Sequence, residues 1–237
     1  MKRLLIAICC AAFVITAGAQ TQARAALDEN TVVKDTTGMQ YPYIVWRKML
    51  SSGEYTLKQI NRANLQDGFL IIKLSEEEKQ KRSERAPKPT ESKFFTTGKD
   101  ISNFKERDID GTKWNLKHLK GKVVVMNFWF INCAPCRQEM PELNKVVEEY
   151  KNDSSVVFLS FCLDEKSSIQ HFLASNPFNY KIVDNARYIA EQYKVSSYPT
   201  HVVLDKEGKV QYHTSGLASG TVPWLKKTIA SLTKQPG

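Results

Sequence analysis

The feature that most constrains this 237-residue chain is an apolar run that ends in two closely spaced cysteines. Residues 123–131 read Val-Val-Val-Met-Asn-Phe-Trp-Phe-Ile, and Cys133-Ala134-Pro135-Cys136 follows almost at once. The apolar run predicts a buried strand. A CxxC at the exit of a buried strand and the start of a helix is the arrangement used for reversible dithiol/disulfide chemistry. The sequence therefore predicts redox chemistry at these two cysteines.

Strand-like and helix-like segments alternate on both sides of the CxxC. Helical periodicity covers 136–150, 166–174, 186–193 and 222–232, and short apolar runs at 123–130, 156–163, 180–183, 200–204 and 209–213 predict strands. Residues 109–112 are predicted to form a turn between two short strands, and 205–208 a hairpin turn. Such alternation is typical of an α/β domain, which we place at residues 98–237.

The residues before this domain follow a different pattern. Short apolar runs separated by glycine turn signals predict a small β-rich accessory region over 20–74, with the stretch 41–50 as one of these runs. Ser75 and Glu78 then form a possible capping box that opens a charged helix, which Pro87 and Pro89 must end. The segment 75–97 is predicted to be a charged, exposed linker.

The first residues predict export. Lys2 and Arg3 precede an apolar stretch from 4 to 15, and small residues place a cleavage site after Ala19. The stretch is shorter than the ~20 apolar residues that a spanning helix needs. Residues 1–19 are therefore predicted to be a signal peptide, and the mature protein to be periplasmic or at another extracytoplasmic face, without stable membrane insertion.

Cysteine usage favours catalysis over structural cross-linking. Outside the predicted signal, the chain keeps Cys133, Cys136 and Cys162. A CxxC bridge closes too small a loop to restrict the unfolded chain much, so it adds little stability. Cys162 lies within an apolar strand, and we expect it to be a buried, inert thiol instead of a third redox partner.

Charge and histidine spacing exclude other classes of function. The chain carries 34 basic and 25 acidic residues, but its positive residues are scattered and are not interleaved with aromatics as in nucleic-acid binders. The histidines, at 118, 171, 201 and 213, lack metal-ligand spacing, so we predict structural or surface roles for them and no metal site.

The CxxC spacing also predicts separate roles for the two cysteines. Cys133, at the first turn of the predicted helix, faces unpaired backbone N–H groups and the positive end of the helix dipole, which stabilise its thiolate. It is the predicted nucleophile. Cys136, one turn further on, is the predicted resolving cysteine, which releases the mixed disulfide formed with a substrate.

Several ordered motifs resemble the TlpA/ResA class of thioredoxin-like proteins. They are Gly121-Lys122, the run 124–129, Cys133 to Pro141, Tyr198-Pro199-Thr200, and 205–209. The resemblance covers residues 98–237 and implies a thioredoxin-like fold, a central mixed sheet flanked by helices. It also implies thiol-disulfide oxidoreductase activity with no cofactor beyond the Cys133–Cys136 disulfide.

The resemblance implies further site residues. Pro199 is expected to be a cis-proline that faces the cysteines, with Tyr198 and Trp129 as further substrate contacts. Glu139 matches the acidic residue that the class keeps near its dithiol and is expected to transfer a proton to or from a cysteine sulfur. Asn127 stands where thioredoxin has a buried aspartate, and an amide cannot accept that proton, so transfer would fall to Glu139 or water.

One departure from the class concerns the residue before the first cysteine. Most relatives have tryptophan there, and this chain has Asn132. The loss of this aromatic side chain would expose the sulfur more and make the rim of the site more polar.

The sequence leads us to expect an exported reductase of client-protein disulfides, since proline before the second cysteine resembles the reducing members of the superfamily. A membrane thiol donor would recharge it, and cytochrome c maturation is one setting. Two alternatives stay open. A peroxiredoxin-type peroxidase wants threonine or serine three residues before its reactive cysteine, where this chain has Phe130. A non-catalytic binding module would need a zinc site that bridges two chains, because structural zinc takes four ligands.

Overall fold

The computed structural model describes residues 27–61 and 64–234. The predicted signal peptide, residues 1–19, lies outside the described residues. The described residues divide into two compact units, one holding those up to Arg47 together with those of Leu57–Ile72, and the other holding Lys48–Thr56 and the described residues from Lys73 onward. The second unit contains the CxxC.

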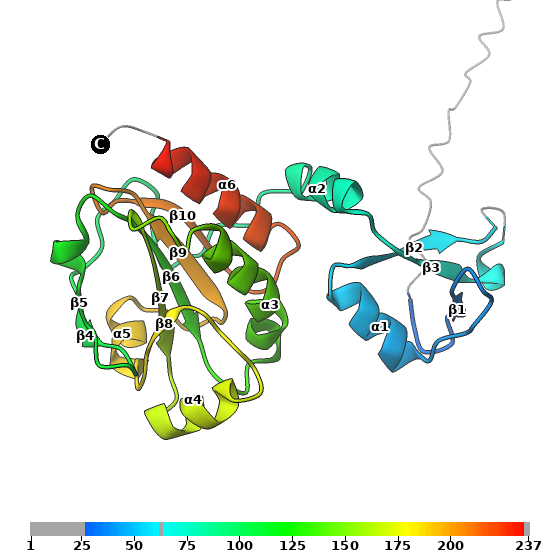
Figure 1. Cartoon of the computed structure of the whole chain (residues 1–237), viewed down its shortest axis with the longest axis horizontal. Helices are drawn as coiled ribbons and strands as arrows, with labels where there is room; N and C mark the ends of the chain where they lie inside the picture. Colours follow the sequence, from blue (N-terminus) through cyan, green and yellow to red (C-terminus); the bar gives the residue numbers. More distant parts are fainter. Residues whose placement is uncertain (1–26, 62–63, 235–237) are drawn as a thin grey trace, which may run out of the picture. The chain divides into compact units, whose positions relative to one another are not determined.

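A mixed sheet forms the centre of the larger unit (Figure 1), and its strand order is β10-β9-β6-β7-β8. The central strand β6 (Val123–Trp129) is parallel to β7 (Val156–Cys162) and antiparallel to β9 (Thr200–Leu204). The edges are β8 (Lys181–Val183), parallel to β7, and β10 (Val210–Ser215), antiparallel to β9. The α/β architecture predicted from the sequence is confirmed.

Every residue of β6 is buried, because helices or loops cover both faces of the sheet. Side chains alternate along a strand, so Val125 and Trp129 enter one core and Met126 and Phe128 enter the other. The first core also receives α3 (Ala134–Glu149), α4 (Lys166–Leu173) and α6 (Thr221–Thr233). The second receives α5 (Arg187–Gln192) and the short helix η2 (Leu116–Leu119). Figure 1 shows α3 and α6 on one face and α5 on the other.

A two-stranded ribbon precedes the central strand. Strands β4 (Lys105–Arg107) and β5 (Lys113–Asn115) are antiparallel, and the predicted turn joins them. Asp108 is buried in this turn, where its carboxylate accepts hydrogen bonds from the backbone N–H groups of Asp110 and Thr112 and from the indole of Trp114. These bonds pair the buried carboxyl oxygens with donors and fix the turn.

The capping box at Ser75 and Glu78 is present and opens α2 (Glu76–Glu84), as predicted. The residues that follow differ from the exposed linker expected from their charge. The Ala86 carbonyl accepts from the Trp224 indole and the Thr90 carbonyl from Thr214, while Phe95 enters the second core. Gly98 and Lys99 pair with Val210 of β10. Because β10 is an edge strand, Val210 has backbone groups free to pair with this segment, and the side chains of His213 and Thr214 bind it further along the strand.

Phe95→Ala is expected to lower the free energy of unfolding by about 3 kcal/mol, because the ring packs on Phe128 and Tyr193 and its removal leaves a cavity. Urea unfolding of the full chain measures this loss. Phe94→Ala is the matched control, since the adjacent ring is only partly buried and should cost clearly less. Equal losses for the two variants would mean that the segment is not anchored through Phe95.

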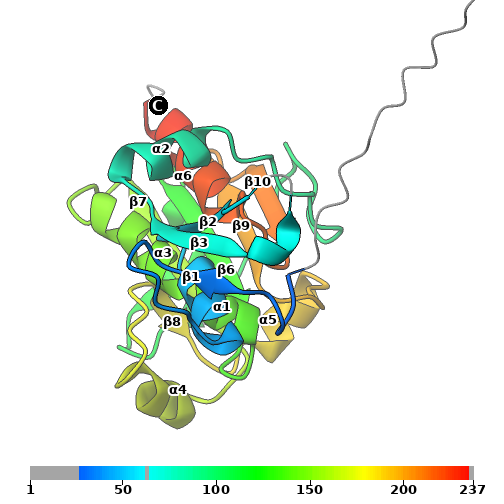
Figure 2. The same ribbon diagram turned by 90° about the vertical axis from the view of Figure 1, so that its right-hand side faces the viewer.

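The remaining sheet has the order β1-β3-β2, built from β1 (Val33–Lys34), β3 (Phe69–Lys73) and β2 (Tyr55–Gln59), as Figure 2 shows. Gly68 adopts a positive φ of 84° in the predicted turn before β3, where a Cβ atom would meet the Val32 carbonyl oxygen at 2.4 Å. Only glycine fits there without strain.

The prediction of a β-rich run over 41–50 is wrong, because Tyr43–Ser51 forms helix α1. Its buried residue is Trp46, whose ring packs edge-on against Tyr43 one turn earlier. In a short segment rich in apolar residues, strand and helix patterns overlap, and burial of the large indole decides between them.

Within residues 27–61 and 64–234, no helix has the length and apolar character needed to cross a bilayer.

Candidate active site

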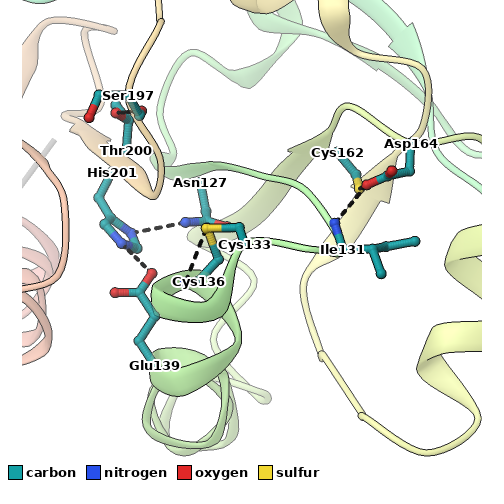
Figure 3. Close-up of a disulfide and its surroundings, with 10 residues drawn as sticks. All are labelled: Asn127, Ile131, Cys133, Cys136, Glu139, Cys162, Asp164, Ser197, Thr200 and His201. Carbon is teal, nitrogen blue, oxygen red and sulfur yellow. Dashed lines mark hydrogen bonds and ion pairs between the residues drawn. A yellow bond between two sulfur atoms is a disulfide. The ribbon is translucent and has the colours of Figure 1, made fainter.

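The CxxC forms the start of α3, directly after the central strand. Cys133 is the N-cap residue, and its Sγ accepts a hydrogen bond from the backbone N–H of Cys136 at 3.2 Å. The two cysteines are joined in a disulfide, with Cα atoms 5.3 Å apart (Figure 3). Pro135 lies in the first turn, where its missing N–H costs no helical hydrogen bond. This geometry confirms the predicted placement of both sulfurs at the helix N-terminus.

The loop before the dithiol meets the loop that carries Pro199. The Tyr198–Pro199 peptide bond is cis, as predicted, and the half-buried Tyr198 ring packs edge-on against Phe130 at a centroid distance of 5.5 Å. Asn132 and Ser197 are exposed, so polar side chains lie at the rim of the site. Phe130, Asn132, Ser197 and Tyr198 together form this rim.

Trp129 is wrongly predicted as a substrate contact. Its side chain is fully buried, its indole N–H donates to Ser160 Oγ at 3.2 Å, and its ring packs against Phe172 and Phe178. Side chains alternate between the two faces along β6, and this alternation directs the side chain of residue 129 into the core. The aromatic ring at the rim belongs to its neighbour Phe130.

Glu139 lies on the same face of α3 as Cys136, as the i, i+3 spacing predicts, and it is buried more deeply than expected, with 4% of its surface exposed. Its Oε1 atom lies 2.7 Å from Nε2 of His201, whose Nδ1 atom lies 3.3 Å from Nδ2 of Asn127 (Figure 3). The three side chains form a continuous hydrogen-bonded chain beside the dithiol.

His201, the middle member of this hydrogen-bonded chain, is a site residue that the sequence did not predict. His201 was predicted to be structural or at the surface, and it is fully buried in β9, directly opposite Asn127 of β6. Two polar residues that interrupt otherwise apolar strands were a usable signal, because buried polar groups need partners. The register between β6 and β9, which places Asn127 opposite His201, could not be predicted from the sequence.

Cys162 is a free, fully buried thiol at the end of β7, as predicted. Its Sγ lies 3.5 Å from Oδ2 of Asp164, and the same oxygen accepts the backbone N–H of Ile131 at 2.7 Å. Burial raises the pKa of this thiol above its ordinary value of 9.0. Its surroundings therefore favour the protonated thiol over the thiolate.

The raised pKa of Cys162 predicts a loss of stability in alkaline solution. Below pH 9 the folded and unfolded states both hold the proton, and above it only the folded state does, so stability falls by up to about 1.4 kcal/mol per pH unit. Urea unfolding of the oxidised protein at pH 8 and pH 10 should show a smaller loss for Cys162→Ala than for the parent. Some loss should remain, because burial also raises the pKa values of Tyr193 and Tyr212. An unchanged pH dependence in the variant would contradict this prediction.

Among the described residues, no group of three or more histidine, cysteine or acidic side chains is arranged to hold a metal ion.

A dithiol at a helix N-terminus, next to a cis-proline on a mixed sheet, defines the thioredoxin-like class. Residues 97–213 match the model of the AhpC/TSA family. Thioredoxin-like protein YneN of Bacillus subtilis is 36% identical over 116 residues, which cover 48% of this chain and 68% of the relative. Thiol-disulfide oxidoreductase ResA of Bacillus cereus is 36% identical over 115 residues, which cover 48% of this chain and 66% of that relative. The chain belongs to this family of thioredoxin-like thiol-disulfide oxidoreductases.

Solved structures agree on the fold. A putative thiol:disulfide interchange protein DsbE from Chlorobium tepidum superposes with a TM-score of 0.53 at 25% identity, covering 58% of this chain and 98% of its own. A putative protein disulfide isomerase from Bacteroides thetaiotaomicron superposes with a TM-score of 0.55 at 24% identity, and the match covers 60% of this chain and 92% of the isomerase chain. The thioredoxin-like fold predicted from the sequence is confirmed.

Proposed function

We propose that this protein reduces disulfides in client proteins through the Cys133–Cys136 dithiol. The observation that carries the proposal is the disulfide at the N-terminus of α3, beside the rim formed by Phe130, Asn132 and Tyr198. The two sulfurs differ as the two roles require, because Cys133 caps the helix and Cys136 lies within its first turn.

The electron balance of the reaction follows from these positions. The Cys133 thiolate attacks one sulfur of the client disulfide, and the other client sulfur leaves as a thiolate. Cys136 then gives up its proton and attacks Cys133 Sγ, which forms the disulfide present in the structure and releases the second client sulfur. Two electrons pass to the client, whose thiolates take up protons. Glu139, one turn beyond Cys136, is the proposed acceptor of the Cys136 proton.

The oxidised protein then needs a thiol donor. Export of the chain is supported by its N-terminal sequence, and an exported reductase has no access to the cytosolic thiol pool, so the proposed donor is a membrane protein. Cytochrome c maturation, in which reduced cysteines are required, is a setting consistent with this arrangement.

The equilibrium potential of the Cys133/Cys136 couple tests the proposed direction. Thiol trapping of the purified protein in defined redox buffers should give a value near the ~−270 mV of thioredoxin. A value near ~−120 mV, that of a strong oxidant, would reverse the direction. Reduction of insulin disulfides by the reduced protein is the matching activity assay.

Two alternatives are less well supported. A peroxidase would require a polar residue where Phe130 lies, and hydrogen peroxide should then oxidise the reduced protein faster than a protein disulfide does. An intermolecular zinc site would require free thiolates, whereas the two sulfurs are bonded to each other here. Metal analysis of the reduced protein with its mass in solution would reveal such a site.

A further inference from the structure

A row of buried polar side chains crosses the apolar sheet beneath α3. Ser160, Asn127, His201 and Thr214 occupy register partners on β7, β6, β9 and β10, and each is at most 2% exposed. Because cross-strand partners point to the same face, the row faces the core that contains the dithiol and α3. A polar row in such a core costs free energy unless it is hydrogen-bonded, so its purpose needs an explanation.

Glu139 meets this row at His201. The carboxylate reaches the row through one oxygen, Oε1, at 2.7 Å from the imidazole, while Oε2 is buried and has no hydrogen-bond partner among the described residues. With the Asn127 amide donating to Nδ1, the neutral imidazole carries its proton on Nε2 and donates it to Glu139. Asn127 thereby fixes the tautomer in which His201 donates a hydrogen bond to the Glu139 carboxyl group.

Removal of His201 would leave Glu139 in apolar surroundings without a donor. A buried carboxylate in that state favours its protonated form, because desolvation penalises the charge. A protonated Glu139 cannot accept the proton that Cys136 must release. The other titratable groups that face Glu139 are Tyr180 and Tyr212, and burial raises the pKa of each. Neither supplies the hydrogen bond that His201 gives, because the Tyr212 hydroxyl donates to the Thr221 carbonyl and the Tyr180 hydroxyl has no hydrogen-bond partner among the described residues.

We propose that His201 is a positioning residue for proton transfer, which holds Glu139 as an acceptor for the proton of Cys136. The inference rests on the proposed proton transfer by Glu139. The proton leaves Cys136 Sγ as it attacks the mixed disulfide and is held by the hydrogen-bonded Glu139 and His201 side chains. It returns to Cys136 when a donor dithiol reduces the disulfide and Cys136 becomes the leaving thiolate, so each cycle balances.

The test follows the resolution step with a small disulfide. Reduced full-length protein is mixed with glutathione disulfide in a single turnover from pH 5 to 9, and mass spectrometry follows the decay of the Cys133–glutathione adduct. His201→Leu should slow this decay at pH 7 by at least about tenfold, which is less than the ~100-fold lower end for loss of a general base, because Glu139 itself stays in place. It should also move the acid limb of the pH–rate profile to higher pH.

Three further variants separate positioning from a structural role. His201→Gln can donate one N–H to Glu139 and accept from Asn127, and should restore most of the rate. Once Glu139→Gln has removed the acceptor, adding His201→Leu should slow the reaction no further, because two residues that act as a unit are not additive. His118→Leu, at an exposed histidine, is the matched control and should match the parent.

A parent-like pH profile for His201→Leu, or an additive effect in the double variant, would overturn the inference. If Glu139→Gln resolves the adduct at the parent rate, proton transfer by Glu139 itself fails. Neither result bears on whether protein clients are reduced, because glutathione disulfide replaces the client. Conversely, failure to reduce insulin with the pH effects intact would overturn only the proposed function.

Discussion

Cys133→Ser is expected to lower the rate of client-disulfide reduction by at least about a thousandfold, because removal of a covalent nucleophile costs several powers of ten. Serine retains the position at the N-cap of α3 and can still accept the Cys136 N–H, so the helix start should survive. What is lost is the thiolate that attacks the client. An insulin-reduction assay with the purified reduced protein measures the effect.

Cys136→Ser tests whether the two cysteines have the separate roles of nucleophile and resolving thiol. The variant should still attack a client through Cys133 but should accumulate the mixed disulfide, because no second thiol can release it. Non-reducing electrophoresis and mass spectrometry would detect this adduct. Cys162→Ala serves as the control and should form no adduct and retain activity, since its thiol is buried and unused. An active Cys133→Ser variant would mean that another thiol is the nucleophile.

Phe128→Ala is expected to lower the free energy of unfolding by about 5 kcal/mol, the upper range for loss of a buried aromatic ring. Phe128 is fully buried, stacks on Phe161 at 5.1 Å and packs edge-on against Tyr193 at 6.1 Å. A loss of this size is comparable to the whole stability of many domains, so part of the variant should be unfolded at 37 °C. Urea unfolding at 25 °C gives the value.

The matched control for Phe128 is Tyr188→Ala on α5, because Tyr188 is 53% exposed and the substitution should change stability by less than about 1 kcal/mol. Phe128 also lies on the face of β6 opposite the dithiol, so folded Phe128→Ala protein should keep the parent redox potential. A shifted potential would indicate that the second core acts on the dithiol, contrary to the layered arrangement.

Local sequence signals were sufficient for the redox pair and for most of the larger unit. The apolar run of β6, rich in valine and aromatic residues, indicated a buried strand, and the CxxC with Pro135 indicated a helix start after it, so the position of Cys133 followed. The i, i+3 spacing from Cys136 placed Glu139 on the dithiol face of α3 without any knowledge of the sheet. These features depend on interactions within a few residues, which the sequence states directly.

Tertiary structure decided the features that depend on register and on competition for the core. The alternation along β6 put Trp129 inside and left Phe130 at the rim, and a shift by one residue would have reversed them. Backbone groups of the edge strand β10 pair with Gly98 and Lys99, so the segment around Phe95 packs on the sheet although its charged composition predicted an exposed linker. His201 lies 62 residues from Glu139, and no local pattern joins them; only the pairing of β9 with β6 and the packing of α3 bring the imidazole to the carboxylate.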